Sequence, residues 1–226
     1  MNPKDHVCPY SKNPFCSSLN VADRSELCEN CHQFPFHKNQ NAEEKQKEII
    51  REMSLKPSTY CTLILSGCVC TSKSASTLTR HALVLWEAGD IMHTQAIFGD
   101  GESMYEFWHY RFITDGCCAI FNADVLKKLF LSSVTFSTAL FSSVTKTQER
   151  QTQFLLGTQL QYAREAIKFV LIYCKQNHYP PLTHEQIAYL CGLDRTTVTK
   201  MLKKIMQEDN LDISLHEYMK NMYIKE

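Results

Sequence analysis

The 226-residue sequence has no long apolar run and no excess of charge of either sign. Its longest apolar runs, such as FVLIYC, fall far short of the roughly 20 residues that a helix needs to span a bilayer. Its 24 basic and 24 acidic side chains cancel, so any contact with nucleic acid must come from a local basic face. The first thirty residues lack the apolar core and cleavage site of a secretory signal. The composition predicts a soluble, cytoplasmic protein without a membrane partner.

Signatures of common enzymes are also missing. The chain has seven glycines, and none of them form a glycine-rich phosphate-binding loop. No Ser/His/Asp set typical of hydrolases stands out. The cysteines match neither the compact triplet of radical enzymes nor ferredoxin-type spacing. These absences predict that the protein is not an enzyme.

Cysteine, by contrast, is abundant, with eleven residues. Five of them lie among apolar or β-branched neighbours and are expected to be small buried core residues: Cys61, Cys68, Cys70, Cys174 and Cys191. Four others fall within the first 31 residues: Cys8, Cys16, Cys28 and Cys31. Residues 1–40 are polar and proline-containing without helical or strand period, so we expect this arm to lack a fold of its own unless something ties it down.

Metal ligation would explain this arm. The cytosol keeps thiols reduced, and thiolates are soft ligands that select iron–sulfur clusters or zinc. The Cys28-x2-Cys31 pair places two sulfurs on one side of a tight turn. Ligation free energy would then become folding free energy for the arm. Residues 1–40 are therefore predicted to be a cysteine-rich arm that binds a metal or cluster.

The rest of the chain divides by its periodicity. Residues 41–130 begin with a short charged helix and continue with short β-branched and aromatic runs (YCTLIL, ALVLW, HYRFIT) separated by turn signals, which predicts an antiparallel β domain. ADVLKKLFL reads as a short helix. A long helix over residues 131–158 follows, then a C-terminal domain over 159–226 that starts with a second amphipathic helix.

The long helix is a candidate dimerisation helix. One face repeats at spacings of three and four, apolar at its ends and polar in the middle: Phe141, Val144, Gln148, Gln151 and Leu155. Such a seam is typical either of a weak, switchable two-stranded dimer contact or of a helix packed on its own domain.

The sharpest signal is LTHEQIAYLCGLDRTTVTKMLKKI (residues 182–205). Thr183 is a natural N-cap, and Gln186 completes a capping box. Gly192 supplies the left-handed turn that ends the first helix, and Asp194 caps the second. This pattern predicts a helix-turn-helix whose second helix enters a DNA major groove. The alternative is a solvated basic helix in another α domain.

The second helix exposes four positive charges and no negative one. Arg195 is expected to make a bidentate guanine contact, with Thr196 and Lys200 contacting bases or phosphate. Lys203 and Lys204 are expected at phosphates. The full predicted DNA-binding set is Thr183, Arg195, Thr196, Thr197, Thr199, Lys200, Lys203 and Lys204. Residues after 208 are expected to form a short wing.

These parts together resemble the Crp/Fnr family of bacterial transcription regulators, over about residues 60–215. LILSG and LWEAGDI are similar to the strand-and-turn motifs of the family's β-roll, and EQIAYLCGLDRTTVTKMLKKI to its helix-turn-helix. The resemblance implies an α+β fold: a cysteine-rich arm, a degenerate cyclic-nucleotide-binding-like antiparallel β-roll, a long dimerisation helix and a C-terminal winged helix-turn-helix. MHTQAIFGDGESMYEFWHYRF has nothing similar to the family's phosphate cassette, so no cyclic nucleotide is expected.

The oxygen-sensing Fnr branch implies a further feature, an iron–sulfur cluster held by N-terminal cysteines and one cysteine of the roll. GCCAIFNADVLKKL resembles the segment that supplies the roll ligand, with Cys118 the better match. Adjacent strand residues point to opposite faces, so Cys117 and Cys118 cannot both be ligands. The expected ligands are Cys16, Cys28 and Cys31 with either Cys8 or Cys118, holding a cluster expected to be 4Fe-4S.

The sequence therefore predicts a homodimeric transcription regulator, responsive to O2, NO or another redox cue, that binds a near-palindromic double-stranded DNA site. RNA polymerase is a further expected partner. A thiol/disulfide, zinc or haem-dependent regulator of the same family remains an alternative, as does a non-DNA-binding iron–sulfur redox protein.

Overall fold

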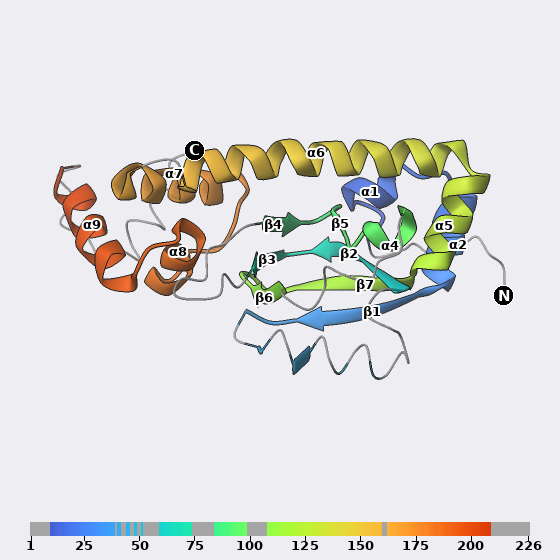
Figure 1. The fold of residues 1–226 in the computed structure, drawn as a ribbon, viewed down its shortest axis with the longest axis horizontal. Coiled ribbons are helices and arrows are strands. Elements are labelled where there is room, and N and C mark those ends of the chain that lie inside the picture. The colour runs from blue at the N-terminus through green and yellow to red at the C-terminus, as the bar shows by residue number, and fades with distance from the viewer. Residues whose placement is uncertain are drawn as a thin grey trace. The chain divides into compact units, whose positions relative to one another are not determined.

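A computed structural model describes residues 10–38, 40–41, 44–45, 48, 51, 59–73, 84–98, 108–159 and 162–208 (Figure 1). The chain forms two compact units, one of residues 1–70 and 86–149 and one of residues 71–85 and 150–226. Cys8, the expected wing and most of the expected charged helix at 41–54 lie outside the described residues.

Residues 13–36 of the N-terminal segment are folded. They contain helices α1 (Pro14–Ser17) and α2 (Val21–Glu29) and strand β1 (Cys31–Phe36). The Asn13 side chain accepts hydrogen bonds from the first amides of α1 and donates to the carbonyls of Ile64 and Leu65 at 2.9 and 3.0 Å. Asn20 caps α2. Residues 13–36 are tied down in this way, because side-chain caps and a strand partner in the sheet satisfy their backbone.

The larger sheet has the strand order β1-β7-β2-β5. Its other strands are β2 (Tyr60–Ser66), β5 (Ile91–Met92) and β7 (Gly116–Asn122), and the β1–β7, β2–β7 and β2–β5 pairings are antiparallel. The arm strand β1 pairs with β7 from Cys31↔Phe121 to Phe36↔Gly116. A second sheet has the order β4-β3-β6, with β3 (Cys68–Lys73), β4 (Val84–Glu87) and β6 (Trp108–Phe112). The predicted antiparallel β domain is confirmed, and the arm adds a strand to it.

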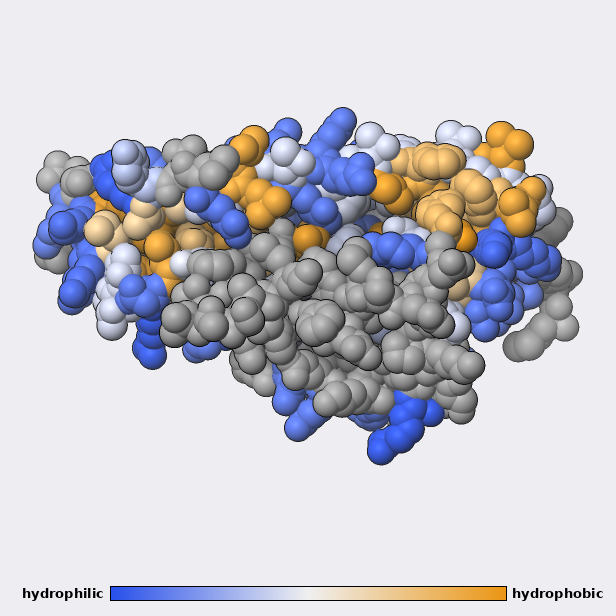
Figure 2. Space-filling view, in the orientation of Figure 1, coloured by the Kyte–Doolittle hydropathy of each residue, from blue (hydrophilic) through white to orange (hydrophobic). Residues whose placement is uncertain are grey.

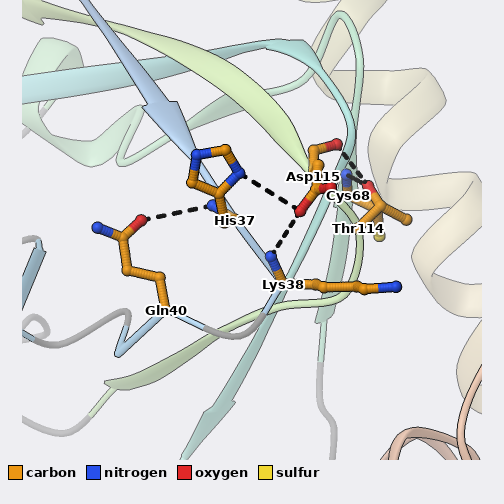
Figure 3. A network of polar contacts seen from close by, with 6 residues as sticks. All are labelled: His37, Lys38, Gln40, Cys68, Thr114 and Asp115. Carbon is orange, nitrogen blue, oxygen red and sulfur yellow. Dashed lines mark hydrogen bonds and ion pairs between the residues drawn. The ribbon is translucent and has the colours of Figure 1, made fainter.

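A polar network fixes the end of β1 to the turn before β7 (Figure 3). The Asp115 carboxylate accepts a hydrogen bond from the Lys38 amide at 2.9 Å and lies 3.6 Å from Nδ1 of His37. The neighbouring Thr114 hydroxyl accepts from the Cys68 amide at 2.9 Å. The register of β1 is thus set by specific contacts at its end as well as by the ladder.

Strand β7 divides the interior of the first unit into two apolar clusters. Cys117, Ala119 and Phe121 pack in the cluster that includes the buried residues of α1 and α2. Cys118 and Ile120 pack in the cluster on the other face. The alternation expected for adjacent strand residues is confirmed, and it places the two neighbouring thiols in different surroundings.

Helices α4 (Gln95–Phe98), α5 (Ala123–Ser132) and α6 (Val134–Gln159) complete the order of elements before the C-terminal helices. Phe136 and Leu140 of α6 are fully buried in the first unit. The Ser143 hydroxyl donates to the Gly89 carbonyl at 2.9 Å, and the Thr147 hydroxyl to the buried Asp90 carboxylate at 2.6 Å. The Gly89–Asp90 turn of the roll is therefore hydrogen-bonded to the long helix.

The second unit is helical in its described C-terminal part. It holds the end of α6, α7 (Ala163–Gln176), α8 (His184–Cys191) and α9 (Arg195–Glu208). Gly157 allows close packing, since a Cβ there would lie 2.5 Å from the Phe169 ring. Ile187, Val198 and Ile205 are fully buried. Among the described segments, no helix is long and apolar enough to span a membrane.

Candidate functional site

Three of the arm cysteines line one pocket in the first unit, here called the cysteine pocket. Its empty volume is about 320 Å³, open solvent at its mouth included. The walls are mostly apolar side chains from α2 and the sheet. The lining residues are Tyr10, Cys16, Arg24, Leu27, Cys28, Cys31, Gln33, Leu63, Leu65, Ala119 and Phe121. Folding thus brings together three of the five predicted cysteine ligands.

Each of these thiols comes from a different element. Cys16 is buried on α1, Cys28 is exposed near the end of α2, and Cys31 begins β1. The Cys31 thiol donates to the Cys28 carbonyl at 3.5 Å, so the turn of the Cys28-x2-Cys31 pair is the junction between helix and strand. In the described part of the chain, no three His, Cys, Asp or Glu side chains lie close enough to share one metal ion.

Cys118 is not brought to the cysteine pocket. It lies on the opposite face of β7 from Ala119 and Phe121, and its thiol donates to the Phe34 carbonyl at 3.8 Å. Burial raises the pKa of the Cys118 thiol to about 12, and neighbouring Cys117 adds to this increase. Cys117 is the cysteine of β7 that shares a face with the pocket lining. Neither cysteine of β7 lines the pocket, and Cys117 is the one that lies on the pocket's side of the strand.

The donor set of the pocket fits a thiolate-ligated cluster better than a single ion. In a cluster the thiolates bind different irons, so their sulfurs stand farther apart than the sulfurs around one ion. Three thiols at a partly open, mostly apolar cavity supply soft ligands and a route for small molecules. Cys16, Cys28 and Cys31 are thus the described residues that could hold such a group.

The second candidate site is the predicted helix-turn-helix, and its local signals are present. Thr183 and Gln186 form the capping box at the start of α8. Gly192 ends α8 in the left-handed conformation with φ 64°. Asp194 accepts hydrogen bonds from the Thr196 and Thr197 hydroxyls and, at 2.8 Å, from the Thr197 amide. These hydrogen bonds hold the pKa of Asp194 well below its usual range, with Thr196 the largest cause.

The exposed face of α9 is basic. Arg195, Thr196, Lys200, Lys203 and Lys204 are exposed, while Val198, Leu202 and Ile205 are buried on the opposite face. All four predicted threonine contacts have internal partners: the Thr183 hydroxyl accepts from the Gln186 amide in the capping box, and the Thr196 hydroxyl bonds the Asp194 cap. The Thr197 hydroxyl bonds the Asp194 cap, and the Thr199 hydroxyl bonds the Arg195 carbonyl and His184.

His184 is a residue that the sequence reading did not select. Its Nδ1 lies 2.8 Å from the Thr199 hydroxyl and joins the start of α8 to the middle of α9. Burial lowers the pKa of His184, and the neighbouring Arg195 charge lowers it further. A neutral His184 therefore supports the crossing of the two helices beside the basic face. Its position at the first turn after a capping box was the only sequence signal.

The predicted dimer face of α6 is partly available. Phe141 is 57% exposed and Gln148 is exposed, whereas Val144, Gln151 and Leu155 are half-buried. Exposed apolar side chains also gather where α6 begins: Phe98, Leu131, Val134 and Phe141. Figure 2 shows apolar side chains grouped over this end of α6, beside α5. Phe98, Phe130 and Phe141 form a ring cluster there, with centroids 5.1 to 6.4 Å apart.

The fold is of the Crp/Fnr type: a roll of antiparallel sheets, a long helix and a helix-turn-helix. Similar solved structures include a protein assigned to the Crp/Fnr family from Eubacterium rectale ATCC 33656 (16% identity, TM-score 0.60, covering 94% of this chain and 98% of that one). The c-di-GMP responsive global regulator CLP of Xanthomonas campestris is also similar (15% identity, TM-score 0.63, covering 86% and 96%).

A third structure of this kind is a Crp/Fnr-family transcriptional regulator from Thermus thermophilus (14% identity, TM-score 0.57, covering 86% and 99%). No protein-family model and no curated protein sequence matches the chain. At these identities the likeness shows the fold, and function has to be argued from the two sites.

Proposed function

We propose that this protein is a homodimeric transcription regulator that binds double-stranded DNA and responds to a redox or gas signal through its cysteine pocket. The observation that carries the proposal is the helix-turn-helix. Its α9 is capped by Asp194, anchored by Val198 and exposes Arg195 and Lys200. A basic face on a helix held at such a turn is the geometry that reads a major groove. The Crp/Fnr-type fold supports this reading, because the solved structures it resembles include transcriptional regulators.

The proposed sensor is an iron–sulfur cluster, expected as 4Fe-4S, at the cysteine pocket. Cys16, Cys28 and Cys31 would hold it, with Cys8 or Cys117 as a fourth ligand. When bound, such a cluster supplies redox chemistry and reactivity toward O2 or NO at a partly open site. The protein's own part is to orient three thiolates from α1, α2 and β1 and to surround them with mostly apolar side chains.

A contact path joins the cysteine pocket to α6. The ring of Phe15, next to Cys16, lies 5.8 Å from that of Phe136, edge to face. The buried Asp23 accepts a hydrogen bond from the Ser133 hydroxyl at 2.6 Å, just before α6 begins. Glu26 pairs with Lys128 of α5 at 2.9 Å. A change in the arm would therefore alter the support of the long helix, and so shift the population of dimer geometries that present α9 to DNA.

Dimerisation through α6 follows from its exposed residues in this proposal. Phe141 and Gln148 leave a mixed apolar and polar stripe, which suits a weak and adjustable contact between two copies. RNA polymerase is the partner such a regulator would act on. Cyclic nucleotides remain outside the proposal, because the sequence has no phosphate cassette after AGDI.

The first test is a visible spectrum with iron and sulfide analysis, on protein purified without oxygen and then exposed to air. We expect a broad cysteinyl-cluster absorbance that bleaches in air. A colourless protein containing zinc, a colourless protein with a new disulfide, or a sharp haem band would each overturn the cluster and select the matching alternative sensor.

The DNA-binding part is tested separately. Protein with and without its cofactor is used to select sequences from a random double-stranded DNA pool, and enriched sites are measured by fluorescence anisotropy. We expect a near-palindromic consensus whose half-sites are one helical turn apart, bound by a dimer. Failure of both forms to enrich any sequence would overturn the regulator and favour a non-DNA-binding redox protein.

A further inference from the structure

Arg24 of α2 is the only arginine among the described residues that line the cysteine pocket. One end of its guanidinium is fixed, because Nη2 donates to the Leu19 carbonyl at 3.0 Å. Its Nε–H is buried and has no hydrogen-bond partner among the described residues. None of the carboxylates in the described part of the chain forms an ion pair with Arg24. The structure thus holds a permanent cation, with one buried donor unused, at the wall of a thiol-lined pocket.

Arg24 lies on the same helix face as Cys28 and is hydrogen-bonded to the segment that follows Cys16. Arg24 and Cys28 are four residues apart on α2, so they share one face of the helix on consecutive turns. Leu19, to which Arg24 is bonded, donates its amide to the Cys16 carbonyl at 3.3 Å. The guanidinium is therefore tied to the junction between α1, which carries Cys16, and α2, which carries Cys28.

A buried N–H of a charged group normally has an acceptor, because leaving it unpaired costs the lost solvation. Of the other lining residues, Leu27, Leu63, Ala119 and Phe121 are apolar, and the polar Tyr10 and Gln33 do not bond this Nε–H. A neutral thiol is only a weak acceptor. A thiolate or a sulfide of a bound cluster is an anionic acceptor, and a hydrogen bond between charged groups is stronger than a neutral one.

We propose that Arg24 is the residue that compensates the negative charge of the loaded cysteine pocket, by donating its Nε–H to a thiolate or sulfide sulfur. This inference rests on the proposed cluster. Net charge and hydrogen bonds to sulfur set the reduction potential of an iron–sulfur cluster. Arg24 stabilises the more negative, reduced state of the cluster and so raises its potential, and it slows the loss of the cluster.

The test compares Arg24→Gln and Arg24→Lys with wild type. Arg24→Gln removes the charge, and Arg24→Lys keeps a charge without the planar donor. The control is Lys12→Gln, which removes one positive charge from an exposed position in the same arm. Potentials are measured by anaerobic redox titration followed by visible absorbance, and cluster loss by the rate of bleaching with an iron chelator.

For Arg24→Gln we expect a reduction equilibrium shifted about tenfold toward the oxidised form, which is ~59 mV more negative for one electron. Cluster loss should be about tenfold faster. Arg24→Lys should show a smaller change in both the potential and the loss rate. Lys12→Gln should have the wild-type potential and loss rate, because water screens the charge of Lys12. Equal potentials and equal loss rates in wild type and Arg24→Gln would overturn the inference while leaving the cluster itself in place.

Thermal unfolding of the cluster-free protein separates this role from a structural one. If Arg24 acts on the bound cluster, the cluster-free Arg24→Gln and wild-type proteins unfold at the same temperature, since only one carbonyl contact is lost. A lower unfolding temperature for the cluster-free variant, with an unchanged potential in the loaded form, would mean that Arg24 only holds the α1–α2 junction. A wild-type protein without a cluster would overturn both the proposed sensor and this role.

Discussion

The helix-turn-helix and the cysteine pocket are built in opposite ways. The first is made of 24 consecutive residues, from Leu182 to Ile205, and the capping hydrogen bonds that define its two helices join residues three positions apart. The second collects Cys16, Cys28 and Cys31 from three elements and closes them against Leu63 and Phe121, from strands far along the chain. The helix-turn-helix can be predicted from the sequence because its signals lie a few residues apart. The cysteine pocket exists only when the sheet has formed.

This difference also separates the ways in which the two sites can fail. The basic face of α9 depends on caps and a few core contacts inside its own unit, so a lesion there should leave the cysteine pocket intact. The pocket depends on a strand pairing and on the face that each strand residue presents, so a ligand substitution there should leave α8 and α9 folded. The following experiments test that separation.

The largest expected effect is that of Cys28→Ser. Serine cannot replace a thiolate as a soft ligand, so we expect complete loss of the visible cluster absorbance. Circular dichroism should show the same helix content, because Cys28 is exposed in the protein. Cys174→Ala, a buried cysteine of α7, is the matched control and should keep the absorbance. Full absorbance in Cys28→Ser would contradict the proposed ligand set.

The second experiment compares two adjacent cysteines of β7. Cys118→Ala should keep the full iron content, because the Cys118 side chain packs among apolar residues on the face of the sheet opposite the cysteine pocket. Cys117→Ala and Cys8→Ser together identify the fourth ligand, since one of them should lose most of its iron. The assignment by strand face would be wrong if Cys118→Ala lost its iron while Cys117→Ala retained it.

The third experiment moves to the DNA-binding face. Arg195→Ala should weaken binding to the selected site by about 1–3 kcal/mol and relax the preference at one base position. Lys203→Ala should weaken all sequences about equally and reduce the salt slope of binding by ~1. Both are measured by anisotropy over a range of salt concentrations, and both variants should show the wild-type cluster spectrum. Equal loss on all sequences for Arg195→Ala would remove it from the base-reading residues.

The smallest effect is expected for Gly192→Ala. Gly192 has φ 64°, and an L-residue in this left-handed conformation costs about 1–2 kcal/mol. Thermal unfolding of the C-terminal helices should therefore occur at a lower temperature, with the cluster spectrum unchanged. Gln207→Ala, at an exposed position of α9, is the control and should be nearly neutral. An unchanged unfolding temperature for Gly192→Ala would show that the turn can adopt another conformation.

Much of the fold was predictable where the signal is local. The capping box at Thr183, the left-handed Gly192 and the buried Val198 were read correctly, because each follows from residues within one turn of a helix. The antiparallel strands and the helices at 123–132 and 134–159 were also indicated by periodicity. The bonding of Thr199 to His184 was not predicted, since it depends on how two helices cross.

The arm was harder to predict, for a physical reason. Residues 31–36 have little strand pattern, and they form β1 because β7 offers an open edge and Asp115 fixes its end. Asn13 and Asn20 are a local signal for α1 and α2, because each caps its helix, but the prolines and polar residues around them favour an irregular segment. No local signal separates Cys117 from Cys118, and only the pleat of β7 shows which of them lies on the pocket's side of the sheet.

By itself, the sequence determined the two kinds of chemistry in this protein: soft thiol ligands in an N-terminal group, and a basic helix set by caps and a turn. Residue type and spacing over a few positions suffice for both. The tertiary structure decided which thiols line one pocket and which face of β7 forms its wall. It also decided that Arg24 lies beside these thiols. Those relations join residues up to about a hundred positions apart, and they exist only through sheet pairing and the packing of helices against it.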